Sequence, residues 1–185
     1  ISSLNPEFKI EKKDKTSFSQ KNYFKLKVEL DKYSQIIYSP LIEVPAIILS
    51  QSKMFPGSEE FYNQREGVYL FGVEENFLYN EKLISKYLLN EKSAIPNNGL
   101  IISAYLSKKI NKSVSDEIDL LFYDYTLNTF IAKKFVINNI YNTQTQNDEF
   151  FIYTNINALN LNKSNIYCSN IIGYYEDEFT NLDMI

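Results

Sequence analysis

The sequence predicts an α+β fold, because strand-like and helix-like patterns follow one another along the chain. The stretch 99–153 carries the clearest signals. Its apolar run Leu100 to Ile102 is typical of a short strand buried on both faces. Ser103 then stands at the N-cap of a predicted helix, in which Leu106 and Ile110 share one face. Further strands are predicted here, over 117–123, 130–141 and 150–153.

The first part of the chain carries weaker patterns. Residues 8–12 alternate apolar with charged side chains and predict a strand. Residues 23–37 carry apolar side chains at helical spacing and predict a helix, although the alternation at 25–30 leaves a strand as the alternative. Pro40 and Pro45 exclude a continuous helix through the segment that follows.

Two strands are predicted on either side of a turn-rich stretch. The first covers 45–50 and the second 68–73. Between them, Pro56-Gly57 lies in a polar segment and is the strongest turn signal of the chain. Short helices are then predicted at 83–89 and 155–161, and a last strand is predicted over Ile171 to Tyr175.

Composition limits the classes of partner. Of the 185 residues, 44% are apolar and 23% are charged, as in ordinary folded chains. The formal net charge is -4 and basic residues form no dense cluster, which disfavours nucleic acid as the main partner. The sequence lacks an apolar run of membrane-spanning length, and its start lacks the pattern of a signal peptide, so neither is expected.

Residue usage also argues against common catalytic machinery. The chain has no histidine, and its one cysteine, Cys168, therefore lacks the partner of a Cys–His dyad. We expect Cys168 to be a buried thiol. The sequence has no phosphate-binding loop of the Walker type. No catalytic residue, metal or cofactor is predicted, and the chain is not expected to hydrolyse ATP, esters, peptides or glycosides.

Carboxylates occur in four groups, at 74–75, 116–119, 148–149 and 176–178. A glycosidase would need two of them facing each other across a cleft, which spacing alone cannot show. We favour the interpretation that they are solvated strand ends. None of the groups has the spacing of a calcium-binding loop.

Aromatic residues make up 15% of the chain, with 15 Tyr, 13 Phe and no Trp. Packing between strands is the favoured explanation, since Tyr and Phe are common in β-rich cores. An exposed contact surface is the alternative. The candidate partner contact is Phe55, Phe61 and Tyr62, which surround the turn at Pro56-Gly57.

The order and spacing of these motifs resemble the extracytoplasmic domain of FtsX-like ABC transporter permeases, the group that includes macrolide exporters and lipoprotein-releasing permeases. The likeness is clear over 67–185 and loose before it. It begins with the strand Gly67 to Val73 and closes with Ile172 to Tyr175 and 177–183. Between them the matching positions are Ile101, Ile102, Ser103, Leu106, Lys109, Ile110, Val114, Asp116, Ile118, Leu120, Phe122, Lys134, Phe135, Val136, Ile140, Tyr141, Thr143, Asp148 and Phe151.

Two positions depart from the family pattern. Ser115 stands where the family has a turn glycine, and Asn139 stands where it has the glycine before Ile140. Asparagine tolerates left-handed backbone more easily than serine. We therefore expect Asn139 to keep the geometry of the glycine, whereas the turn type at Ser115 is open.

The resemblance implies a two-part periplasmic domain, with 67–164 inserted into a subdomain made of 1–66 and 165–185. Such a domain would not be an enzyme. It would belong to a permease subunit in the inner membrane, on the periplasmic side, and would couple ATP hydrolysis to export or release of a lipoprotein, peptide, lipid or drug. The implied partners are a cytoplasmic ATPase subunit, a second permease copy, and a lipoprotein or periplasmic protein.

Two structural expectations follow from that arrangement. The strand at 8–12 should share a sheet with the strand at 171–175, and Ile1 and Ile185 should lie on one side of the domain. The alternative function is a secreted or surface binding module that recognises glycan or protein through Tyr and Phe. A hydrolase that uses carboxylates is disfavoured because nothing in the sequence pairs them.

Overall fold

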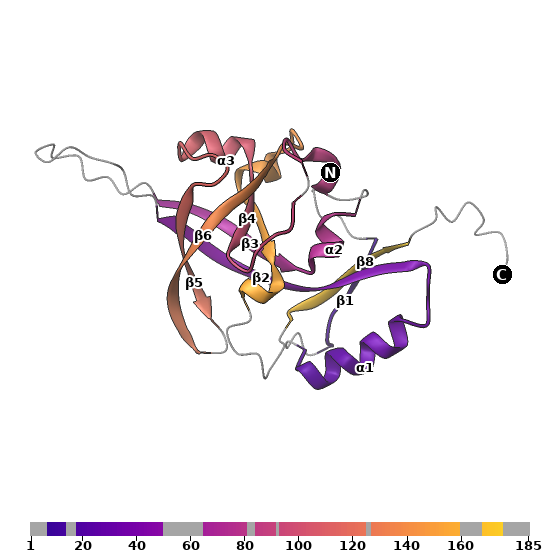
Figure 1. Cartoon of the computed structure of the whole chain (residues 1–185). Helices are drawn as coiled ribbons and strands as arrows, with labels where there is room; N and C mark the ends of the chain where they lie inside the picture. The colour runs from indigo at the N-terminus through magenta and orange to yellow at the C-terminus, as the bar shows by residue number, and fades with distance from the viewer. Residues whose placement is uncertain are drawn as a thin grey trace, which may run out of the picture.

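The computed structural model of the chain describes residues 7–13, 18–49, 65–80, 84–91, 93–124, 127–159 and 168–175. Strands account for 49% of the structure and helices for 23%. The expected α+β class with two parts is therefore wrong, and the protein is mostly β. The helices are short, whereas six of the strands close into a barrel (Figure 1).

The barrel closes because its first strand pairs with both the second and the last strand of a curved sheet. Going round, the strands are β2 (Ile36–Leu49), β3 (Arg65–Val73), β7 (Phe151–Asn155), β4 (Gly99–Ser103), β6 (Thr129–Tyr141) and β5 (Glu117–Asp124). The β3–β7 and β4–β6 pairs are parallel and the others are antiparallel. Closure comes from β2, in which Ala46 pairs with Phe122 of β5 and with Val68 of β3.

A smaller side sheet extends from the same long strand. Residues 36–41 of β2 pair with β8 (Asn170–Tyr175), and β8 pairs with β1 (Phe8–Ile10). The predicted sharing of one sheet by these two terminal strands is confirmed. We call β1, β8 and residues 36–41 the side sheet. Because β2 runs through both sheets, it ties the side sheet to the barrel (Figure 1).

The helix predicted over 23–37 is confirmed only in part. The longest described helix, α1, covers Gln20–Leu30, and Ile36 and Ile37 already belong to β2. The strand alternative at 25–30 is wrong. Ser19 caps α1 by accepting a hydrogen bond from Asn22 N. The predicted cap at Ser103 is confirmed, since its Oγ accepts from Leu106 N at 3.0 Å. The remaining helices are short: α2 (Glu75–Leu78), α3 (Ala104–Lys109) and the 3-10 turns η1 (Ile84–Tyr87), η2 (Gln146–Glu149) and η3 (Ile156–Ala158).

Two hydrophobic clusters hold these elements together. The first fills the barrel with alternate side chains of its strands, among them Ile48, Leu70 and Leu100, which are fully buried. Tyr23 and Leu30 of α1 belong to the same cluster. The second cluster lies where α2 and η1 cover the strands from outside, and its members are Leu41, Phe71, Val73, Phe77, Leu78, Ile84, Ile95, Ile101, Tyr141, Tyr153, Ile172 and Tyr174.

The expectation that Asn139 keeps the backbone geometry of a glycine is wrong, and the turn at Ser115, which was left open, is left-handed. Ser115 adopts a left-handed backbone with φ 74°, a conformation that residues other than glycine rarely adopt. Asn139 is not among the described residues with positive φ. It lies in β6 beside a register shift opposite Leu100 and Ile101, and its buried amide donates to the Glu91 carbonyl at 3.1 Å. Asparagine serves there as a hydrogen-bonding side chain.

Some expectations concern residues outside the described part of the chain. Ile1 and Ile185 lie outside it, as do the acidic residues at 176–178. The boundaries expected between the two parts, 1–66 with 165–185 and 67–164, stay a prediction.

Candidate functional site

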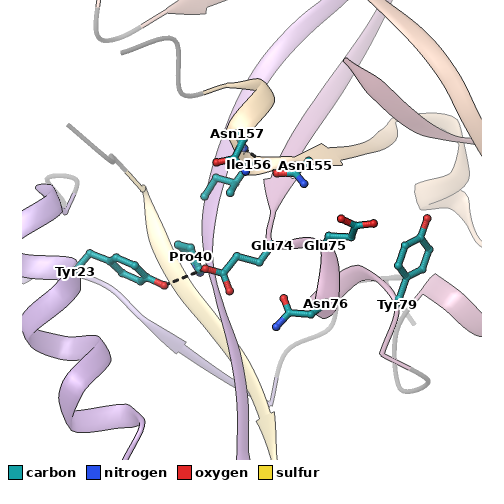
Figure 2. Close-up of a pocket in the computed structure, with 9 residues that line it drawn as sticks. All are labelled: Tyr23, Pro40, Glu74, Glu75, Asn76, Tyr79, Asn155, Ile156 and Asn157. Atoms are coloured by element: carbon teal, nitrogen blue, oxygen red, sulfur yellow. Dashed lines mark hydrogen bonds between the residues drawn. The ribbon is translucent and has the colours of Figure 1, made fainter. Parts of the chain in front are cut away.

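An open cleft of about 650 Å³ lies where the barrel meets the side sheet (Figure 2). Its walls come from α1, β2, α2 with the residues beside it, and the end of β7 with η3. A cleft of this size suits a small ligand or part of a larger one. The lining residues are Tyr23, Pro40, Glu74, Glu75, Asn76, Tyr79, Asn155, Ile156 and Asn157.

Glu74 takes its place directly after β3, at the start of α2. Its backbone N–H donates to Ser39 Oγ at 2.8 Å, which fixes the turn against β2. Gly72, two residues earlier, allows η3 to pack closely on β3, since a Cβ at Gly72 would lie 2.7 Å from Leu159 Cδ1 and 3.3 Å from Ile156 Cα. The local sequence thus brings η3 and α2 to the same cleft.

The carboxylate of Glu74 is the most perturbed acidic group of the cleft. Tyr23 Oη of α1 donates to its Oε1 at 3.4 Å (Figure 2). Burial raises the pKa of Glu74, and the positive charge of Lys27 and the Tyr23 hydrogen bond offset only part of that rise. Burial and the charge of Glu74 likewise raise the pKa of Tyr23. The effect of burial on the Glu74 carboxylate therefore exceeds that of its favourable contacts.

Glu75 and Tyr79 hold α2 against the segment that precedes β4. Glu75 Oε1 accepts from Ile95 N at 2.9 Å, and Tyr79 Oη donates to the Ser93 carbonyl. Burial raises the pKa of Tyr79, with the charge of Glu75 as a second cause. These contacts give the cleft a fixed wall on one side.

The side-chain oxygens of Asn76 and Asn155 accept hydrogen bonds from backbone N–H groups close by in the sequence. Asn76 Oδ1 accepts from Phe77 N at 2.9 Å, and Asn155 Oδ1 accepts from Asn157 N at 3.0 Å. Their amide N–H groups are consequently the part of each side chain that can serve a ligand. The cleft combines carboxylate acceptors with amide donors.

A second acidic cleft, of about 380 Å³, lies beside the start of β5. Two of its three carboxylates have a cation or a backbone donor close by. Glu117 forms an ion pair with Lys134 at 2.9 Å, and Asp116 Oδ2 accepts from Ser113 N at 2.8 Å. Lys112 also lines this cleft. Positive and negative side chains thus largely balance one another in the second cleft, and it is the weaker candidate for a binding site.

The predicted contact residues Phe55, Phe61 and Tyr62 lie outside the described residues.

The prediction that the carboxylates are solvated is wrong for two described positions. Glu74 is half-buried in the first cleft. Asp148 is only 5% exposed, and hydrogen bonds from the Thr143 and Gln144 backbone N–H groups compensate the burial of its carboxylate.

The expectation for Cys168 is confirmed, because its side chain is fully buried and burial raises the pKa of the thiol to about 12. The described residues contain no group of three or more His, Cys, Asp or Glu side chains placed to hold a metal.

The first cleft was not predicted from the sequence, because the segments that form its walls are far apart along the chain. The only local signal was the run Glu74-Glu75-Asn76 after a strand.

No protein-family model matches the chain, and no curated protein matches it. Within the described part of the structure, every helix is too short or too polar to span a lipid bilayer.

Proposed function

We propose that the chain is the extracytoplasmic domain of an FtsX-like ABC permease subunit. It would lie on the periplasmic side of the inner membrane and would catalyse no reaction itself. It would couple ATP hydrolysis on a cytoplasmic ATPase subunit to export or release of a lipoprotein, peptide, lipid or drug. A second permease copy and a lipoprotein or periplasmic protein are its further partners.

One observation carries this proposal beyond the sequence likeness: the described chain enters and leaves the domain at the same place. Glu7 N donates to the Gly173 carbonyl at 3.0 Å, and Tyr175 N donates to Glu7 Oε2 at 2.7 Å. The antiparallel pairing of β1 with β8 produces this arrangement. A domain inserted between two membrane helices needs its first and last residues on the same side. The pairing of β1 with β8 in the side sheet is consistent with that requirement.

Thiol labelling in cells tests the location. Val28 is 62% exposed on α1, whereas Cys168 is fully buried, so Val28→Cys adds one reactive thiol and the unmodified protein is the control. Expressed from its whole reading frame, the variant should fractionate with membranes. A membrane-impermeant maleimide should label it in intact cells whose outer membrane has been permeabilised. Labelling that appears only after the inner membrane is lysed would contradict the proposal.

The secreted or surface binding module remains the second candidate, and the cleft at Glu74 favours it. Its polar and aromatic lining is of the kind that binds ligands. The same labelling experiment separates the two candidates. A binding module would be labelled without lysis but would appear in the soluble or secreted fraction.

A further inference from the structure

The charge of the first cleft is unbalanced. Its lining includes the carboxylates of Glu74 and Glu75 and contains no lysine or arginine. Among the described residues, no ion pair involves either carboxylate. The positive charge that acts on Glu74 is that of Lys27, whose Nζ donates to Tyr38 Oη at 3.2 Å and pairs with Asp31 at 3.5 Å. The cleft thus presents two carboxyl groups with no cationic side chain in its lining.

This charge selects the kind of ligand that can cover the cleft. A ligand without hydrogen-bond donors would remove water from two carboxylates without replacing its hydrogen bonds, and a neutral donor would replace those bonds but leave the negative charge uncompensated. A ligand with a positive group would offset that cost, because a charge-assisted hydrogen bond replaces the lost water. The raised pKa of Glu74 shows that the carboxylate is already partly desolvated before anything binds.

The asparagines indicate what surrounds the positive group. The side-chain oxygens of Asn76 and Asn155 already accept backbone N–H groups, so they are poor metal ligands. Their amide nitrogens can donate to carbonyl oxygens. An extended peptide offers carbonyls beside a lysine or arginine side chain, and it therefore matches both the acceptors and the donors of the cleft.

We propose that this cleft binds a basic peptide segment of a partner protein. A lysine or arginine side chain of that segment contacts Glu74 and Glu75, and neighbouring peptide carbonyls accept from Asn76 and Asn155. The site serves this purpose whether or not the domain is tethered to a membrane. The second cleft lacks this capacity, because Lys134 already pairs with Glu117.

A titration of the isolated chain with two matched peptides tests the proposal. The probes are acetyl-GSGKRKGSG-amide and acetyl-GSGQQQGSG-amide, followed by ¹⁵N NMR. The basic peptide should shift the amide signals of residues 74–76 and 155–157 in a saturable way, and the neutral peptide should not. Glu74→Gln and Glu75→Gln should each weaken binding about tenfold, while Glu117→Gln in the second cleft should leave the affinity unchanged.

Thermal unfolding of each variant shows whether it folds, and if Glu74→Gln does not fold, Glu75→Gln carries the test alone. Several results would overturn the proposal. Equal binding of the neutral peptide would remove the role of charge. Shifts of amide signals centred on the second cleft would show that the peptide binds there instead. An affinity for the basic peptide that neither Glu74→Gln nor Glu75→Gln changes would show that this cleft does not bind it. Equivalent shifts produced by calcium chloride or by maltotriose would assign the cleft to a metal or a sugar.

Discussion

In the barrel every strand pairs with a neighbour on each side, whereas the side sheet ends at β1, whose outer edge has no strand partner among the described residues. The barrel is filled by fully buried side chains from all its strands. The side sheet has short strands, and all three residues of β1 are at least partly exposed. The comparison indicates that the barrel supplies most of the stability and that the side sheet supplies the entry and exit of the chain.

Truncating one core side chain in each region should give the largest difference. Leu100→Ala in β4 removes a fully buried side chain from the barrel and should lower the free energy of unfolding by about 3–4 kcal/mol. Ile10→Ala in β1 removes a partly buried side chain and should cost about 1 kcal/mol. Urea unfolding of both variants measures the difference. Equal losses would show that the two regions contribute alike.

Two strand glycines give a second contrast, of smaller size. A Cβ at Gly173 in β8 would lie 2.2 Å from Phe8 Cζ and 2.8 Å from the Ile37 carbonyl oxygen, so Gly173→Ala should destabilise the protein by about 2 kcal/mol. A Cβ at Gly67 in β3 would meet nothing within 4 Å, so Gly67→Ala should be nearly neutral. Thermal unfolding compares them. A harmless Gly173→Ala would mean that β1 is not packed on β8 as described.

The smallest effect concerns the cleft between the two regions. The pKa of Glu74 is raised in the folded state, so the folded protein holds this proton more tightly than the unfolded chain. That stabilisation is complete below the ordinary carboxyl pKa and is lost as pH rises through the raised value. The charged groups Lys27 and Asp31 of α1 also act on this carboxylate.

Glu74→Gln should therefore stabilise the protein at pH 7, by no more than about 1 kcal/mol, and the gain should shrink toward pH 4. Glutamine can still accept the hydrogen bond from Tyr23. Urea unfolding at several pH values gives the measurement, with Glu117→Gln as the control on an exposed carboxylate. A variant less stable than the unmodified protein at pH 7 would show that the Glu74 charge is well compensated.

Local chemistry predicted those parts of the fold that depend on neighbouring residues. The cap at Ser103, the buried strand at 100–102 and the burial of Cys168 follow from such patterns. The pairing of β1 with β8 came from the family likeness. Barrel closure did not follow, because it depends on β2 pairing with β5, far away in sequence. The prediction that Pro40 and Pro45 exclude a helix is confirmed, since both lie inside β2, but the length of that strand, which runs through both sheets, was not predicted.

The candidate site was harder to predict than the fold. Tyr23 and Glu74 are 51 residues apart, and they meet only because α1 packs beside β2 and α2 begins where β3 ends. A carboxylate at a strand end is usually solvated, and the sequence around Glu74 has no feature that marks it as an exception. Burial by a distant segment is a tertiary effect, which the spacing of residues along the chain does not reveal.

The central claim is that the chain enters and leaves the domain at one edge of the side sheet. Spin labels at Glu7→Cys and Tyr175→Cys test it by electron spin resonance, in which dipolar broadening reports short distances and pulsed measurement reports long ones, with Glu7→Cys and Leu127→Cys as the comparison pair. Leu127 lies in the connection between β5 and β6, which are barrel strands that pair with neither β1 nor β8. The 7–175 distance should be short, narrowly distributed and clearly below the 7–127 distance. A 7–175 distance as long as the 7–127 distance would contradict the account.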